Sequence, residues 1–258
     1  SKEKIIHKNI YKSKHLENIN SHKHTQNIDS NLTLIYLKNI KPKFIIKDSY
    51  NLDYFWEEKI FNFKDVKLIV IDDLIKKHKC HLYINFNFFD KLNSKQKSQL
   101  GMKNLIGPKY AIIPKFHQKY DVQNFIEGTY VLLTLSNNQL FKKTYIKVIK
   151  ILLKLNLKIK VVLGTNERFH EEIKNKFKNQ MIQFIQFTNN MEHLLANCMY
   201  AITGGGNINY EKCFLGVPSL VIILSKDQTV LSNYLEKNNS LIIVSNFNDS
   251  KLEINLKM

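Results

Sequence analysis

Three consecutive glycines, Gly204, Gly205 and Gly206, stand in the stretch TGGGNINYE at residues 203–211. A short apolar run precedes them, and the residues that follow suit a helix that begins near Asn207. Glycine lets a ligand approach the backbone closely and also permits a positive φ. The free N–H groups at the start of a helix, together with its dipole, attract an anion. The stretch therefore predicts a site for an anion such as a diphosphate, bound by the three glycines and Asn207.

The residues downstream add a second strand-to-helix turn. Glu211 would lie on the first turns of the helix, where its carboxylate can accept hydrogen bonds from ribose hydroxyls. Residues 216–220 close this helix and open a buried strand, and another helix begins at Asp227 and Gln228. Two such turns at the carboxyl edge of a parallel sheet commonly frame a nucleotide pocket, in which Gln228 could contact sugar or phosphate. The spacing matches neither GxxxxGK[ST] nor GxGxxG, and the glycines alone are equally compatible with a turn that binds no ligand.

The elements that position these residues follow from the spacing of apolar runs. Short runs rich in β-branched residues, separated by helix-length stretches, predict an α/β fold with buried parallel strands. Right-handed crossovers between such strands give a doubly wound sheet. We expect an N-terminal domain over residues 1–124 and a nucleotide-binding domain over residues 125–258. The runs lie at residues 44–46, 68–71, 82–84, 131–135, 159–163, 182–187, 199–202, 220–224 and 241–244.

Composition narrows the classes of function. The 258 residues carry a net charge of +17, but the lysines are spread along the chain and Arg168 is the single arginine. This distribution favours a small anionic ligand over nucleic acid. The sequence contains no run of 18 apolar residues, so no membrane span is predicted, and no signal peptide is recognisable. We therefore expect a cytoplasmic protein. The three cysteines form no CxxC pair, which argues against a disulfide framework or a zinc site.

Several motifs in order resemble the UDP-sugar hydrolases of the pseudaminic acid pathway, a group of the GT-B type. The motifs are Lys47-Asp48-Ser49-Tyr50, Ile71-Asp72-Asp73-Leu74, Gly107-Pro108-Lys109-Tyr110-Ala111-Ile112-Ile113, and the glycine stretch with Glu211. The resemblance implies two Rossmann-like domains. The family's N-terminal glycine-rich loop, which carries a histidine, has no counterpart here. We therefore expect the first domain to be truncated at its N-terminus.

The resemblance also implies a reaction. Such enzymes hydrolyse UDP-2,4-diacetamido-2,4,6-trideoxy-β-L-altropyranose to the free sugar and UDP, without a metal or other cofactor. It places Tyr50 and Asp227 among the catalytic positions, with Tyr50 orienting the water or the sugar. Asp227 stands where the family tends to have asparagine, and its negative charge beside a diphosphate is unfavourable unless it is paired.

Two alternatives remain open from the sequence. A GT-B glycosyltransferase would use the same UDP pocket and pass the sugar to an acceptor. A catalytically inactive nucleotide-sugar-binding homologue would keep the pocket alone, and the missing histidine loop favours it if Ser1 is the natural start. The sequence does not predict an oligomeric state.

Overall fold

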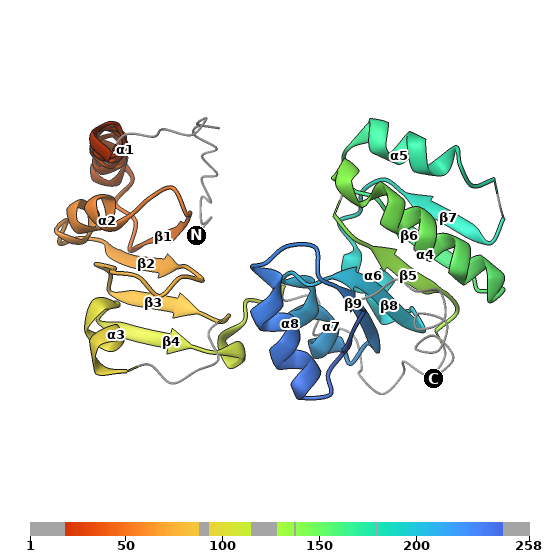
Figure 1. Cartoon of the computed structure of the whole chain (residues 1–258). Coiled ribbons are helices and arrows are strands. Elements are labelled where there is room, and N and C mark those ends of the chain that lie inside the picture. Colours follow the sequence, from red (N-terminus) through yellow and green to blue (C-terminus); the bar gives the residue numbers. More distant parts are fainter. Residues whose placement is uncertain (1–18, 88–92, 115–127, 137, 179, 245–258) are drawn as a thin grey trace. The chain divides into compact units, whose positions relative to one another are not determined.

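The computed structural model describes residues 19–87, 93–114, 128–136, 138–178 and 180–244. The chain divides into two compact units, Ser1–Tyr110 and Ala111–Met258 (Figure 1). Each unit has its own parallel sheet and its own hydrophobic core. The boundary predicted after residue 124 falls outside the described residues.

The first unit contains a four-stranded parallel sheet in the order β1-β2-β3-β4. The predicted apolar runs form β1, β2 and β3, whereas β4 follows no such run and was missed. Helix α1 packs against α2, which is capped by the Asp53 side chain. The bounds are α1 Ile19–Ile40, β1 Phe44–Asp48, α2 Tyr54–Phe61, β2 Lys67–Ile71, β3 Leu82–Asn85, α3 Ser94–Gln99, β4 Lys103–Ile106 and the 3-10 turn η1 Pro108–Tyr110.

The core of the first unit lies between its sheet and the α1–α2 pair. Trp56 and Ile60 of α2 are buried against Leu68 and Val70 of β2 and against Tyr83 of β3. Residues 72–81 connect β2 to β3 without forming a helix. The groups that follow the strands therefore lie on loops at the carboxyl edge of this sheet.

The second unit contains a six-stranded parallel sheet in the order β10-β9-β8-β5-β6-β7. All six runs predicted in this half form strands, and the doubly wound arrangement is confirmed. The strand order reverses between β5 and β8, and ligands of doubly wound folds bind beyond the carboxyl ends of the strands at this reversal. The strands are β5 Val131–Thr134, β6 Ile159–Val162, β7 Ile182–Ile185, β8 Tyr200–Gly204, β9 Ser219–Ile222 and β10 Ile242–Ile243.

Helices cover both faces of this sheet. Ile202 of β8 belongs to the cluster formed with α4, while its neighbour Ala201 belongs to the cluster with Leu195 and Leu215 on the opposite face. Within the described ranges, each helix is too short or too polar to cross a membrane. The helices are α4 Lys142–Lys154, α5 Glu167–Lys174, α6 Met191–Ala196, α7 Ile208–Leu215 and α8 Gln228–Lys237, with the 3-10 turn η4 Gln139–Phe141.

Candidate functional site

The glycine stretch lies at the carboxyl edge of the second sheet, where the strand order reverses. Strand β8 ends at Gly204, and α7 begins at Ile208. The predicted sequence of strand, glycine loop and helix is thus confirmed. At the far end of α7, Gly216 adopts the left-handed conformation with φ 73°, which stops the helix before β9. The stretch places a helix N-terminus at the position where this fold binds ligands.

The three glycines serve different purposes. None of them has a positive φ, so backbone strain does not explain them. A Cβ on Gly205 would lie 2.6 Å from Ser232 Oγ, and one on Gly204 would lie 3.0 Å from Leu224 Cδ1. Packing therefore requires glycine at Gly205 and favours it at Gly204. A Cβ on Gly206 would meet nothing within 4 Å, so this residue faces open space.

Backbone donors point out of the N-terminus of α7. Among the hydrogen bonds formed within the described part of the chain, none is donated by the N–H of Gly206, Asn207 or Ile208. Asn207 occupies the cap position, but its side chain makes no capping hydrogen bond. Unpaired donors and the positive end of a helix dipole together form a site that attracts an anion.

Gln228 joins the loops that follow β8 and β9. Its Oε1 accepts hydrogen bonds from the N–H of Gly205 at 2.9 Å and of Leu224 at 3.0 Å. This oxygen is thus committed to the fold, and any ligand contact by Gln228 involves its amide NH2. The preceding residue, Asp227, is exposed at the cap position of α8 and makes no capping hydrogen bond. The ligand contact predicted for Gln228 and the catalytic role predicted for Asp227 stay predictions.

Helix α7 presents two polar faces. Glu211 is half-buried and lies four residues after Asn207, so the two share the face on which a ribose role was predicted. Asn209 and Lys212 share the fully buried face. Neither amide atom of Asn209 has a hydrogen-bond partner in the described structure, and Lys212 Nζ donates to Thr203 Oγ1. Sequence reasoning assigned no role to either residue. For Lys212 the reason is that an isolated lysine in a lysine-rich chain gives no signal of burial.

Strand ends also meet at the carboxyl edge of the first unit. The hydroxyl of Tyr50 donates to Asp73 Oδ2 at 2.8 Å, and Asn87 Nδ2 donates to Asp73 Oδ1 at 2.9 Å. The hydrogen bond to Asp73 is the main reason why the pKa of Tyr50 rises to about 12. Tyr50, whose exposed fraction is 66%, is therefore a neutral phenol that can orient a water but cannot act as a base near neutral pH. Its catalytic role stays a prediction, and no motif in the sequence singles out Asn87 as a neighbour of Asp73.

A second polar cluster, absent from the sequence-based hypothesis, lies inside the first unit. The buried Glu57 carboxylate accepts hydrogen bonds from Lys47 Nζ at 2.6 Å, His78 Nδ1 at 2.9 Å and the N–H of Lys79 at 2.8 Å. Burial opposes ionisation of Glu57, but the hydrogen bond from His78 and the charge of Lys47 outweigh it and lower the pKa. The cluster fastens the 72–81 connection to α2 and β1.

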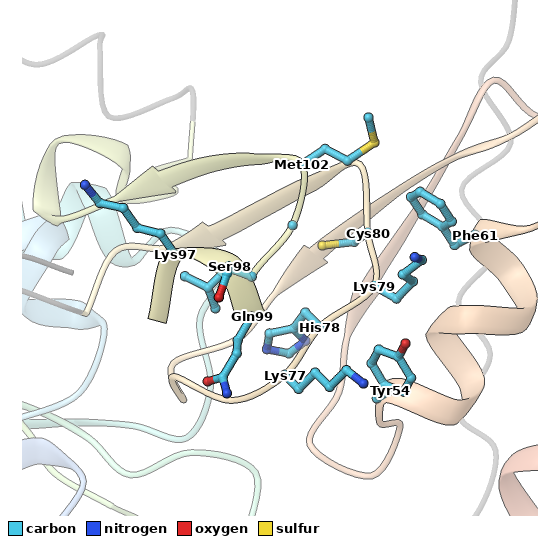
Figure 2. Close-up of a pocket in the computed structure, with 12 residues that line it drawn as sticks. Tyr54, Phe61, Lys77, His78, Lys79, Cys80, Lys97, Ser98, Gln99 and Met102 are labelled. Atoms are coloured by element: carbon cyan, nitrogen blue, oxygen red, sulfur yellow. The ribbon is translucent and has the colours of Figure 1, made fainter. Parts of the chain in front are cut away.

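A pocket of about 390 Å³ lies beside this cluster, and Figure 2 shows the side chains that line it. Two of the lysines that line it lie beside aromatic rings. Lys77 Nζ lies 3.9 Å from the centre of the Tyr54 ring, and Lys79 Nζ lies 5.1 Å from that of Phe61. Since His78 is bound to Glu57, we assign this pocket no part in the site.

The fold is similar to that of several solved structures. MurG from Acinetobacter baumannii is 11% identical with a TM-score of 0.58, and the match covers 91% of this chain and 69% of MurG. UDP-GlcNAc 2-epimerase from Methanocaldococcus jannaschii, in complex with UDP-GlcNAc and UDP, is 14% identical with a TM-score of 0.55. The match covers 92% of this chain and 74% of the epimerase. Os79 from O. sativa, in complex with U2F and trichothecene, is 12% identical with a TM-score of 0.62. The match covers 92% of this chain and 72% of Os79.

These likenesses show that the chain has the GT-B fold, with two Rossmann-like units, as predicted. At such low identity they show the fold alone. Neither a scan against protein-family models nor a search of curated proteins gives a match. The resemblance to the pseudaminic acid pathway hydrolases therefore stays a prediction.

Proposed function

We propose that the chain binds a UDP-sugar at the carboxyl edge of the second unit and hydrolyses it to UDP and the free sugar. The N-terminus of α7 carries this proposal. It lies at the reversal of strand order, its first N–H groups have no partner among the described residues, and Gly206 opens onto free space. The GT-B neighbour solved with UDP-GlcNAc and UDP supports a ligand of the same class.

Each part of the ligand has a matching group. The diphosphate oxygens accept hydrogen bonds from the N–H groups of Gly206, Asn207 and Ile208, and Glu211 accepts hydrogen bonds from the ribose hydroxyls. A water attacks the anomeric carbon while the bond from this carbon to the UDP oxygen breaks. The α7 dipole stabilises the charge that develops on departing UDP. The Asp227 carboxylate, at the start of α8 in the same unit, accepts the proton of the water.

Calorimetric titration with UDP, with UMP and ADP as comparison ligands, tests the binding step. Gly206→Ala is the sharpest variant, because its Cβ meets no protein atom and can only obstruct a ligand. We expect wild-type protein to prefer UDP, and both Gly206→Ala and Glu211→Ala to weaken binding at least tenfold, about 1.4 kcal/mol. Glu171→Ala on α5 removes an exposed carboxylate elsewhere and serves as the matched control. Equal affinity for UDP in all four proteins would refute the site.

The reaction is tested separately by following UDP release from the diacetamido-trideoxy UDP-sugar, with and without candidate acceptors. Release in water alone, abolished by Asp227→Asn, supports the hydrolase. A glycosyltransferase is the second candidate, because other GT-B neighbours are described as a glycotransferase of kitacinnamycin and a spinosyn rhamnosyltransferase. Release only with an acceptor favours the transferase, and binding without turnover under either condition identifies an inactive homologue.

A further inference from the structure

Two lysines are buried among the described residues, and they differ in their partners. Lys47 lies 2.6 Å from the Glu57 carboxylate. Lys212 is 1% exposed, and within the described ranges its Nζ forms one hydrogen bond, to Thr203 Oγ1, and no ion pair. Lysine is rarely buried without a paired charge, because removing an ammonium from water is costly. A charged Lys212 would therefore need an anion beside it, and the described residues around it provide none.

The elements packed around Lys212 do not supply that anion. Helix α6 packs against α7 and carries one buried carboxylate, Glu192, which makes no ion pair with Lys212 in the described structure. Burial raises the pKa of the neighbouring Cys198 thiol to about 12 and also raises that of Cys213, so both thiols are neutral. Burial lowers the pKa of Lys212 itself from the ordinary value of 10.5 to about 7.

The position of Lys212 indicates where an anion would come from. It follows Ile208 by four residues, which is about 6 Å along the helix axis, and helical side chains tilt toward the N-terminus. Its hydrogen-bond partner, Thr203, directly precedes Gly204. One turn nearer the N-terminus, Asn209 carries two buried amide atoms without partners. Both residues thus lie on the buried face of α7, close to the strand end from which the glycine loop leaves β8.

We propose that Lys212 is the counter-charge of the diphosphate bound at the N-terminus of α7, and that it takes up a proton when the diphosphate binds. This inference rests on the proposed nucleotide site and deepens it. Lys212 acts through its charge from below the loop and does not touch the ligand, so it is a positioning residue. In the empty site it releases its proton readily, because burial disfavours the charged ammonium and lowers its pKa.

The expected effect follows from Coulomb's law. A unit negative charge on the order of 8 Å away raises the pKa of Lys212 by about 1.5 at an effective dielectric constant of about 20. From a free value of about 7, binding at pH 8 then takes up about 0.7 proton per nucleotide. UDP binds about tenfold more tightly at pH 7 than at pH 9. This window lies above the phosphate pKa of about 6, so the phosphate groups of UDP stay ionised across it, and the Lys212→Met variant subtracts any proton change that belongs to the ligand itself.

The test is titration calorimetry at pH 8 in Tris and in HEPES, whose ionisation enthalpies differ, together with UDP affinities at pH 7 and pH 9. Inorganic pyrophosphate serves as a second probe. Lys212→Met keeps the side-chain length and removes the ammonium, and circular dichroism checks that it folds. Lys237→Met removes the same charge from an exposed position on α8 and is the matched control. We expect proton uptake and pH dependence in wild type and Lys237→Met, and neither in Lys212→Met.

The outcomes separate the inference from the proposed function. UDP binding with the same buffer and pH dependence in wild type and Lys212→Met overturns the role of Lys212 and leaves the nucleotide site standing. A different result is that pyrophosphate binds with Lys212-dependent proton uptake while UDP is not preferred. That result overturns the proposal of a nucleotide ligand and keeps the role of Lys212. Absence of binding by either probe overturns both.

Discussion

Replacing Lys212 by methionine should stabilise the empty protein, and the gain should shrink as the pH rises. Unfolded lysine holds its proton up to a pKa of about 10.5, whereas folded Lys212 releases it near 7 because of burial. Between these values the unfolded chain binds more protons, so the wild-type free energy of unfolding rises with pH. The burial of Lys212 thus costs about 4 kcal/mol at pH 7 and about 2 kcal/mol at pH 9, at ~1.4 kcal/mol per pKa unit.

Methionine also removes the hydrogen bond to Thr203, a loss of about 1 kcal/mol. The expected net gain in unfolding free energy is about 3 kcal/mol at pH 7 and about 1 kcal/mol at pH 9. Urea unfolding followed by far-ultraviolet circular dichroism measures it. Fluorescence of Trp56, the single tryptophan, records the first unit separately and should not change. A variant less stable than wild type at pH 7, or a gain equal at both pH values, would refute the reasoning.

Three further predictions concern other parts of the site and fold. Glu57→Gln removes the charged acceptor of a buried cluster, so the first unit should lose about 3–5 kcal/mol in urea unfolding followed by tryptophan fluorescence. Gln228→Leu leaves the N–H groups of Gly205 and Leu224 without their acceptor, which should cost the second unit about 2 kcal/mol by circular dichroism and weaken UDP binding in calorimetry. Tyr50→Phe should leave the ultraviolet titration of the protein unchanged up to pH 10.5, because Tyr50 ionises at about 12.

The first two predictions have a control variant, and all three have a contradicting outcome. Glu58→Gln only weakens a partly buried hydrogen bond that the Tyr54 hydroxyl donates, and should cost under about 1 kcal/mol. An equal effect of both glutamate variants therefore contradicts the Glu57 cluster. Thr229→Val on α8 is the control for a change of side chain next to Gln228. An equal loss of unfolding free energy in both variants would contradict a special role for the hydrogen bonds from Gly205 and Leu224 to Gln228. For Tyr50, a missing absorbance step below pH 10.5 in the phenylalanine variant would show that the phenol ionises normally.

Most strands could be predicted because central parallel strands are buried on both faces and read as apolar runs. Strand β4 could not, since Lys103 and Asn104 interrupt its pattern and no residue of the strand is fully buried. Helix α1 begins in a polar stretch without a helical stripe. Tertiary hydrogen bonds from Trp56 to Asp29 and from Gln26 to the Asn51 carbonyl hold it, and no local pattern shows these.

The candidate site divides in the same way. The glycine loop and the start of α7 could be predicted because turn chemistry and helix termini are local properties of the sequence. The buried state of Lys212 depends on the packing of α6 and α7 over β8, so a chain with 39 lysine and arginine residues gives no reason to single it out. Asp73 could be found beside Tyr50 only once the ends of β1 and β2 were placed together.

The two sequence interpretations of the glycine triplet, a structural turn and a ligand site, apply to different glycines. Ser232 and Leu224 leave little or no room for a side chain at Gly205 and Gly204, so these two would be retained in a protein that binds nothing. Gly206 has neither a close neighbour nor a positive φ, and packing gives no reason for glycine there. A ligand approaching the N-terminus of α7 supplies that reason. The case for a nucleotide site therefore depends on Gly206 and the N–H groups beside it, and not on the number of glycines.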